Sequence, residues 1–161
     1  MSRKMRLSQD HKELLSALND HNVEYVVVGG YAVGAHAEPR ATKDLDVFIR
    51  ADAANSEAVF KALAAFGAPL SGFTPSDFND GRSVFHMGQP PQRIDVLQHL
   101  DGITFDETWD NREIAVVNDE LAVPIIGIDD LIRNKLAAGR PRDLLDVAEL
   151  VEAKEADAGE S

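Results

Sequence analysis

Hydrophobic and polar positions follow two different periods along the chain, which predicts a mixture of helices and strands. Leu14, Leu15 and Leu18 fall on one face of an amphipathic helix over residues 8–20, and Ser8 is a suitable cap for its first turn. Similar signals predict further helices over residues 31–37, 56–66, 129–138 and 141–152. Short apolar runs rich in β-branched residues predict strands over residues 25–28, 44–49, 83–87, 92–98, 112–117 and 121–124.

The order of these elements predicts an α+β fold, in which helices flank a mixed β-sheet. The third and fourth strands are expected to pair with each other, as are the fifth and sixth. Residues 69–82 are rich in proline, glycine and small polar residues and predict a loop. The length of 161 residues fits a single domain, which we place at residues 1–152, and residues 153–161 predict a flexible acidic tail.

Composition excludes several classes of protein. Apolar residues make up 44% of the chain and charged residues 27%, which is typical of a globular domain and not of a disordered chain. The absence of cysteine excludes disulfide bonds and thiolate zinc sites, and it fits a cytoplasmic location. No apolar run predicts a membrane span or a signal peptide. A formal charge of −12 argues against a broad nucleic-acid-binding surface.

The segment Asp44-Leu45-Asp46 is the first candidate for chemistry. Alternate side chains of a strand share a face, so Asp44 and Asp46 point the same way while Leu45 and Val47 point to the core. Two neighbouring carboxylates repel each other, and a divalent cation bound through oxygen ligands relieves that repulsion. A solvent-exposed edge strand explains the same pattern, so this pair alone leaves both interpretations open.

Two further segments favour the metal interpretation. Gly29-Gly30 follows an apolar strand and opens a helix, where backbone N–H groups can approach phosphate closely. Asp95 lies in a later strand between Ile94 and Val96, which are expected to face the core. A third carboxylate on a neighbouring strand would complete a site for two Mg²⁺ ions, an arrangement that supports in-line displacement at phosphorus.

These segments together resemble the nucleotidyltransferase fold of the DNA polymerase β superfamily. The resemblance is closest to the small bacterial branch with Gly-Gly in the turn, which includes aminoglycoside-type nucleotidyltransferases and the nucleotidyltransferase toxins of abortive-infection (type IV toxin–antitoxin) systems. Gly30 stands where many members have a serine that helps to hold the triphosphate. The resemblance covers roughly residues 20–150 and rests on three motifs in one order: Gly29-Gly30-Tyr31-Ala32, Arg40-x-Thr42-x-Asp44-x-Asp46 and Arg93-Ile94-Asp95-Val96.

The resemblance implies a metal-dependent transfer of NMP from an NTP to an acceptor hydroxyl, with release of pyrophosphate. Asp44 and Asp46 would bind both Mg²⁺ ions. Asp95 would bind the catalytic ion and help to deprotonate the acceptor. Gly29 and Gly30 would hold the β- and γ-phosphates of the NTP.

Three residues just before the acidic pair are further candidates. By the resemblance, Arg40 and Thr42 belong to the nucleotide-binding motif, and Lys43 is a weaker candidate beside them. Arg40 and Lys43 can meet phosphate or the acceptor, and they can equally well neutralise nearby carboxylates.

The helix predicted over residues 129–138 places Lys135 in the middle of an apolar face. A lysine there must either extend to solvent or meet a partner, because an unpaired buried ammonium is strongly unfavourable. Resemblance to the C-terminal block of the toxin-like branch implies that Lys135 offsets charge on the triphosphate and that Asp143 is a weaker site residue. The favourable charge at a helix start explains Asp143 and Asp146 as well. The apolar face consists of Ile128, Leu131, Ile132 and Leu136.

Two other functions stay open at the level of the sequence. The first is an interaction protein with this fold and little turnover, although three intact carboxylates argue against a dead site. The second is a D-x-D glycosyltransferase, for which the chain is short. The acceptor can be a small molecule, a tRNA or a protein, and a toxin role would add an antitoxin protein as partner.

Overall fold

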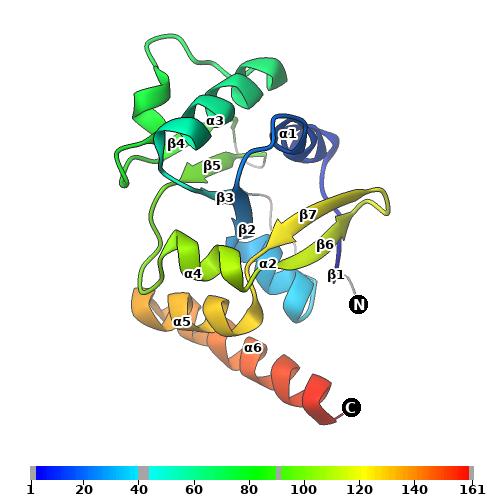
Figure 1. Cartoon of the computed structure of the whole chain (residues 1–161). Helices are drawn as coiled ribbons and strands as arrows, with labels where there is room; N and C mark the ends of the chain where they lie inside the picture. Colours follow the sequence, from blue (N-terminus) through cyan, green and yellow to red (C-terminus); the bar gives the residue numbers. More distant parts are fainter. Residues whose placement is uncertain (1–2, 40–43, 90–91, 160–161) are drawn as a thin grey trace.

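Seven strands from residues 3–125 form one mixed sheet (Figure 1). The computed structural model describes residues 3–39, 44–89 and 92–159. The order across the sheet is β1-β6-β7-β2-β3-β5-β4. The strands are β1 (Arg3–Met5), β2 (Tyr25–Val28), β3 (Leu45–Ile49), β4 (Phe85–Met87), β5 (Ile94–Leu97), β6 (Glu113–Val117) and β7 (Leu121–Ile125).

The strand pairing confirms the predicted α+β class and both predicted hairpins. β4 pairs antiparallel with β5, and β6 pairs antiparallel with β7. In the centre, β2 is antiparallel to β3 and parallel to β7, whereas β3 is parallel to β5. β1, which the hydrophobic pattern does not predict, adds to the edge of the sheet parallel to β6.

Helices cover both faces of the sheet (Figure 1). Side chains of α1 and α3 form one core with the sheet, and those of α4, α5 and α6 form a second core on the other side. The central strand β2 is buried on both faces, which explains its unbroken apolar run. None of the described helices is long and apolar enough to cross a membrane. The helices are α1 (Gln9–Asp20), α2 (Gly29–His36), α3 (Ala53–Phe66), α4 (Phe105–Asp110), α5 (Ile128–Ala138) and α6 (Pro141–Gly159).

Two helices differ from the predicted pattern because of their caps. α3 begins three residues earlier than predicted, since the Asp52 side chain accepts a hydrogen bond from the backbone N–H of Asn55 at 2.7 Å. α4 has no counterpart among the predicted helices; the hydroxyl of Thr104 accepts from the Glu107 N–H, and the Glu107 carboxylate accepts from the Thr104 N–H. The predicted loop 69–82 also contains a short 3₁₀ helix, η1 (Pro75–Phe78).

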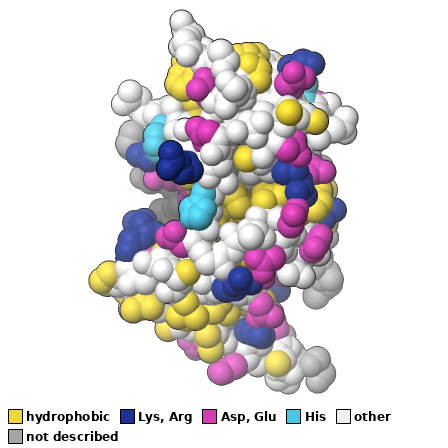
Figure 2. Space-filling model, turned by 60° about the vertical axis from the view of Figure 1, so that its left-hand side comes forward, with side chains coloured by type: hydrophobic (Ala, Val, Ile, Leu, Met, Phe, Trp, Pro, Cys, Tyr) yellow, Lys and Arg dark blue, Asp and Glu magenta, His cyan; other side chains and the backbone are white. Residues whose placement is uncertain are grey.

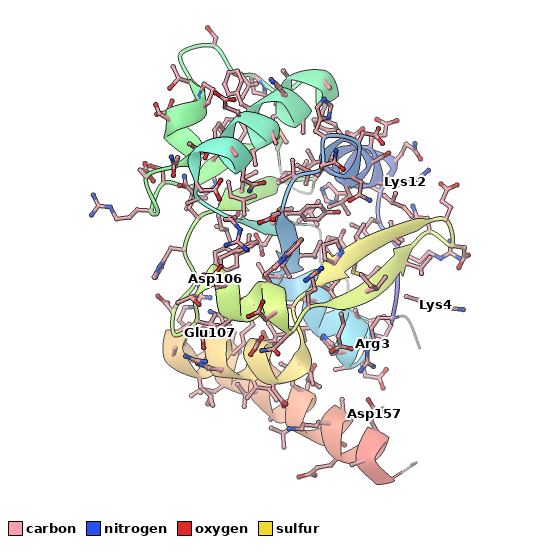
Figure 3. All side chains as sticks on the ribbon, in the orientation of Figure 1. Arg3, Lys4, Lys12, Asp106, Glu107 and Asp157 are labelled. Carbon is pink, nitrogen blue, oxygen red and sulfur yellow. The ribbon has the colours of Figure 1, made fainter. Side chains whose placement is uncertain are left out.

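The predicted helix over residues 141–152 continues to Gly159, so most of the segment predicted as a tail is helical. This segment is rich in alanine, glutamate and lysine, which have high helix propensity. Two ion pairs also tie it to the rest of the fold. Lys154 Nζ lies 2.5 Å from Asp129 Oδ1, and Asp157 Oδ2 lies 3.6 Å from Arg3 Nη2 (Figure 3).

Candidate functional site

A polar cleft of about 470 Å³ lies between the central strands and the pair formed by α5 and α6. It brings together segments that lie far apart in the chain, including the glycine turn, the acidic pair and the start of α6. Its lining residues are Val28, Gly29, Gly30, Asp44, Asp46, Leu97, His99, Leu100, Asp101, Asn134, Lys135, Ala138, Arg140, Arg142, Asp143 and Asp146.

The predicted carboxylates lie on adjacent segments of the sheet. Asp46 on β3 is in register with Val28 on β2 and with Asp95 on β5. Asp44 is exposed and directly precedes β3. Leu45 and Val47 are fully buried, so the predicted alternation of faces is correct. Within residues 3–39, 44–89 and 92–159, the acidic and histidine side chains nonetheless form no ready-made group of three metal ligands.

Asp95 is held by two basic neighbours. Arg93 Nε donates a hydrogen bond to Asp95 Oδ1 at 2.8 Å, and His86 Nδ1 lies 2.6 Å from the same oxygen. Burial works against ionisation of this carboxyl, but the hydrogen bonds from Arg93 and His86 outweigh it and lower the pKa of Asp95 below its usual value. Asp95 is therefore an ionised and oriented carboxylate.

Asp46 has the opposite electrostatic situation. Burial raises the pKa of its carboxyl to about 6, and the nearby charges of Asp95 and Asp44 add to the effect. Lys135 acts in the opposite direction but does not cancel the shift. Ionisation of Asp46 is thus less favourable than in water and would be eased by further positive charge in the cleft, which is the behaviour expected of a cation-binding carboxylate.

The glycine turn places backbone directly against Asp46. Gly29 has a φ of +73°, which glycine adopts without strain. A Cβ at this position would overlap Asp46 Oδ2. The turn opens α2, whose N-cap residue Val28 provides no side-chain hydrogen bond to the first-turn N–H groups. These groups can therefore bind an anionic ligand such as phosphate.

Gly29→Ala is expected to displace the Asp46 carboxylate and so to abolish the binding of NTP and Mg²⁺ that the sequence resemblance implies. The positive φ should also destabilise the fold by about 1–3 kcal/mol. Gly81→Ala is the matched control, because Gly81 has a φ of +75° and a Cβ added there would meet no atom within 4 Å. Calorimetric titration with NTP and Mg²⁺, together with urea unfolding, measures both effects. Equal nucleotide binding by the two variants would contradict this role of Gly29.

Lys135 meets partners within the fold. Its Nζ lies 3.4 Å from Asp143 Oδ1 and 3.1 Å from Asp146 Oδ2, and its side chain is only 11% exposed. Arg140 Nε also donates to Asp143 at 2.7 Å, and this hydrogen bond holds the pKa of Asp143 below its usual value. The carboxylates at the start of α6 therefore do more than interact favourably with the first N–H groups of the helix. They also hold the Lys135 ammonium in place.

The predicted apolar face of α5 is wrong at Leu136, because this side chain is 55% exposed and does not pack into the core. The sequence pattern places it on the same apolar face as Leu131, which is fully buried. α6 packs against the side of α5 that carries Leu131 and Lys135, so the buried face is narrower than the apolar face.

Other cleft residues were not singled out from the sequence. His99, Asn134 and Arg142 line the cleft, and only the pairing of strands reveals that His86 stands opposite Asp95. The predicted hairpin around residues 88–91 could have indicated that His86 and Asp95 pair across the two strands. The predicted candidates Arg40, Thr42 and Lys43 lie outside the described residues.

Two solved structures have a similar fold. The lincosamide antibiotic adenylyltransferase LnuA, solved with lincomycin, aligns with a TM-score of 0.53 at 14% identity, over 91% of this chain and 98% of LnuA. An antigenic nucleotidyltransferase-like protein from Paracoccidioides brasiliensis aligns with a TM-score of 0.54 at 15% identity, over 91% of this chain and 77% of that protein. At these identities the likeness shows the fold.

Comparison of the sequence itself is more specific. No curated protein sequence matches the chain. A family described as "nucleotidyltransferase of unknown function (DUF6036)" matches residues 3–159, which is nearly the whole chain and includes every candidate residue named above. This match confirms the predicted relationship to nucleotidyltransferases. The chain belongs to this nucleotidyltransferase family.

Proposed function

We propose that the protein transfers NMP from an NTP to an acceptor hydroxyl and releases pyrophosphate. The observation that carries the proposal is the position of Asp46, which lies in one cleft with the glycine turn and with Lys135. Membership of a nucleotidyltransferase family supports the same reaction and favours it over glycosyl transfer.

The carboxylates at the cleft suit Mg²⁺. Asp44 and Asp46 line the cleft, and Asp95 stands beside Asp46 on the neighbouring strand. All three offer carboxylate oxygens, which this cation prefers as ligands. The raised pKa of Asp46 reflects crowding of negative charge that a divalent cation would relieve. When bound, Mg²⁺ would neutralise charge on the phosphates and activate the attacking oxygen.

Asp95 is the proposed proton acceptor. The acceptor oxygen forms a bond to the α-phosphorus while the bond between that phosphorus and the pyrophosphate oxygen breaks, and the hydroxyl proton passes to an Asp95 oxygen. Arg93 and His86 orient the carboxylate for this step. Because they also keep it ionised, orientation rather than high basicity would be its contribution.

The glycine turn and Lys135 are proposed to hold the triphosphate. Backbone N–H groups at Gly29 and Gly30 would contact the β- and γ-phosphates. A lysine ammonium has three donors, and Asp143 and Asp146 occupy two directions around Lys135. The third donor would meet a phosphate oxygen, so the two carboxylates would aim the ammonium as well as stabilise it.

The acceptor is proposed to be a hydroxyl compound, for which a small molecule, a tRNA or a protein qualifies. LnuA is an adenylyltransferase for lincosamide antibiotics, which supports a small molecule as the first class to screen. A toxin role with an antitoxin partner is supported by the sequence resemblance to the abortive-infection branch.

Isothermal titration with each NTP in the presence of Mg²⁺ tests the proposed site. We expect micromolar binding by the wild type and none by an Asp44→Ala, Asp46→Ala double variant, because the variant lacks two of the cation ligands. Asp110→Ala, an exposed carboxylate at the end of α4, is the matched control and should bind like the wild type. If the wild type binds no NTP with Mg²⁺ present, the proposal is wrong, and an interaction protein with this fold takes its place.

A further inference from the structure

The outer side of the α5–α6 pair carries an apolar patch, which we define as Leu136, Leu144, Leu145 and Val151. The exposed fractions of these side chains are 55%, 50%, 70% and 39%. Figure 2 shows hydrophobic side chains gathered low on the molecule, the level at which Figure 1 places these helices. Clustered exposed leucines on a surface that is otherwise strongly charged indicate an interaction site.

The packing of α6 explains why this patch has no cover within the described chain. Asp143, Asp146 and Leu150 are buried and mark the inner side of the helix. Leu144, Leu145 and Ala148 are exposed and mark its outer side. A helix whose inner side holds carboxylates and whose outer side holds leucines reverses the usual amphipathic order. The leucines therefore have no role in the core of the single chain.

The charges around the patch are arranged to match a second copy of the same surface. Arg142 precedes the leucine pair and Glu149 follows it, seven residues or about two helical turns later on the same stripe. Both are exposed. In an antiparallel arrangement centred near Leu145, Arg142 of each copy meets Glu149 of the partner subunit. A patch that complements itself in this way is what a two-fold symmetric interface requires.

We propose that the protein forms a two-fold symmetric homodimer through the apolar patch, with α6 of one copy antiparallel to α6 of the other. The leucines form the dry centre of the interface, and the two Arg142–Glu149 pairs fix its direction and register. Because Arg142 also lines the cleft, each subunit borders the cleft of the other. The inference rests on the surface of α5 and α6 and is independent of the proposed reaction.

Sedimentation equilibrium at chain concentrations from about 1 to about 100 µM, a range that spans moderate dimer affinities, tests the interface. The wild type is expected to sediment at twice the mass of one chain, and a Leu144→Glu, Leu145→Glu variant at the mass of one chain. Val84→Glu and Ile114→Glu are matched controls, because both side chains are exposed and neither belongs to α5 or α6. They should leave the dimer intact. Far-UV circular dichroism establishes that each variant is folded. A wild type that is monomeric at the highest concentration, or a dimer that survives the leucine substitutions, overturns the proposal.

Charge reversal tests the antiparallel register. Arg142→Glu and Glu149→Arg should each raise the dimer dissociation constant at least about tenfold, because each places like charges opposite each other twice. An equimolar mixture of the two variants should dimerise as tightly as the wild type, because in the mixed dimer each of the two facing pairs again joins opposite charges. Failure of the mixture to recover overturns the antiparallel arrangement. If the wild type is monomeric and the patch instead binds a helix of another protein, the homodimer proposal is wrong.

Discussion

Asp46→Asn is expected to make the fold more stable while removing nucleotide transfer. In the wild type the ionised carboxylate of Asp46 is partly buried beside Asp95 and Asp44, and the asparagine amide carries no charge to desolvate or repel. Loss of a proposed metal ligand should reduce the transfer rate by about 10³-fold, within the range for removal of one transition-state-stabilising group.

The gain in stability should depend on pH in a defined direction. The pKa of Asp46 is about 6 in the folded state and 3.8 without the fold, so the folded state binds the proton more tightly. Well below pH 3.8 the carboxyl is largely protonated in both states, and the substitution should have little effect. As the pH rises through about 6, ionisation of Asp46 should destabilise the wild type by up to about 3 kcal/mol, which the asparagine variant avoids.

Urea unfolding of the wild type and Asp46→Asn at pH values of about 4 and about 8, on either side of the folded-state pKa, measures this difference. Asp110→Asn removes an exposed carboxylate and should match the wild type at both pH values. Added Mg²⁺ should narrow the gap at the higher pH, because it stabilises only the protein that retains the carboxylate. A variant that is less stable than the wild type at the higher pH would show that Asp46 is a structural residue and not a strained ligand.

Lys135→Met is expected to destabilise the fold by about 3 kcal/mol, the lower end of the range for breaking a buried ion pair, because Asp143 and Asp146 lose their shared ammonium while Asp143 keeps its hydrogen bonds from Arg140. Lys154→Met is the control for loss of a lysine from an exposed ion pair and should change stability by less than about 1 kcal/mol. Chemical denaturation of the purified variants gives both values.

A double variant separates the structural role of Lys135 from its proposed contact with phosphate. Asp146→Asn removes one of the two carboxylate charges that lose the ammonium, so Lys135→Met combined with Asp146→Asn should recover part of the stability. It should not recover nucleotide transfer, because the donor to phosphate is still missing. If transfer returns in proportion to stability, Lys135 acts only on the fold.

The sequence was sufficient for the local features of the site. The period of a strand predicts that Asp44 and Asp46 share a face, and the apolar run before Gly29 predicts a strand that leads into a turn. The capping box formed by Thr104 and Glu107 is also a local sequence pattern, so the start of α4 could have been predicted from it.

Long-range pairing was beyond the reach of local patterns. Nothing in the three residues of β1 indicates that they join β6, which lies near the other end of the chain. Likewise, the parallel register of β3 and β5 determines that Asp95 stands beside Asp46. The partners of Lys135 depend on how α6 folds back on α5, and helical periodicity describes each helix only by itself.

The close approach of Gly29 to Asp46 makes evolutionary changes at these two positions depend on each other. Every residue other than glycine carries a Cβ, so any single substitution at position 29 collides with the carboxylate that position 46 contributes. A lineage that gains a side chain at position 29 must therefore also move the carboxylate of residue 46 or shorten that residue. Relatives that keep the acidic pair should keep the glycine, and relatives that lose the glycine should be free to change residue 46. The reverse does not hold, because the positive φ favours glycine at position 29 even without the carboxylate.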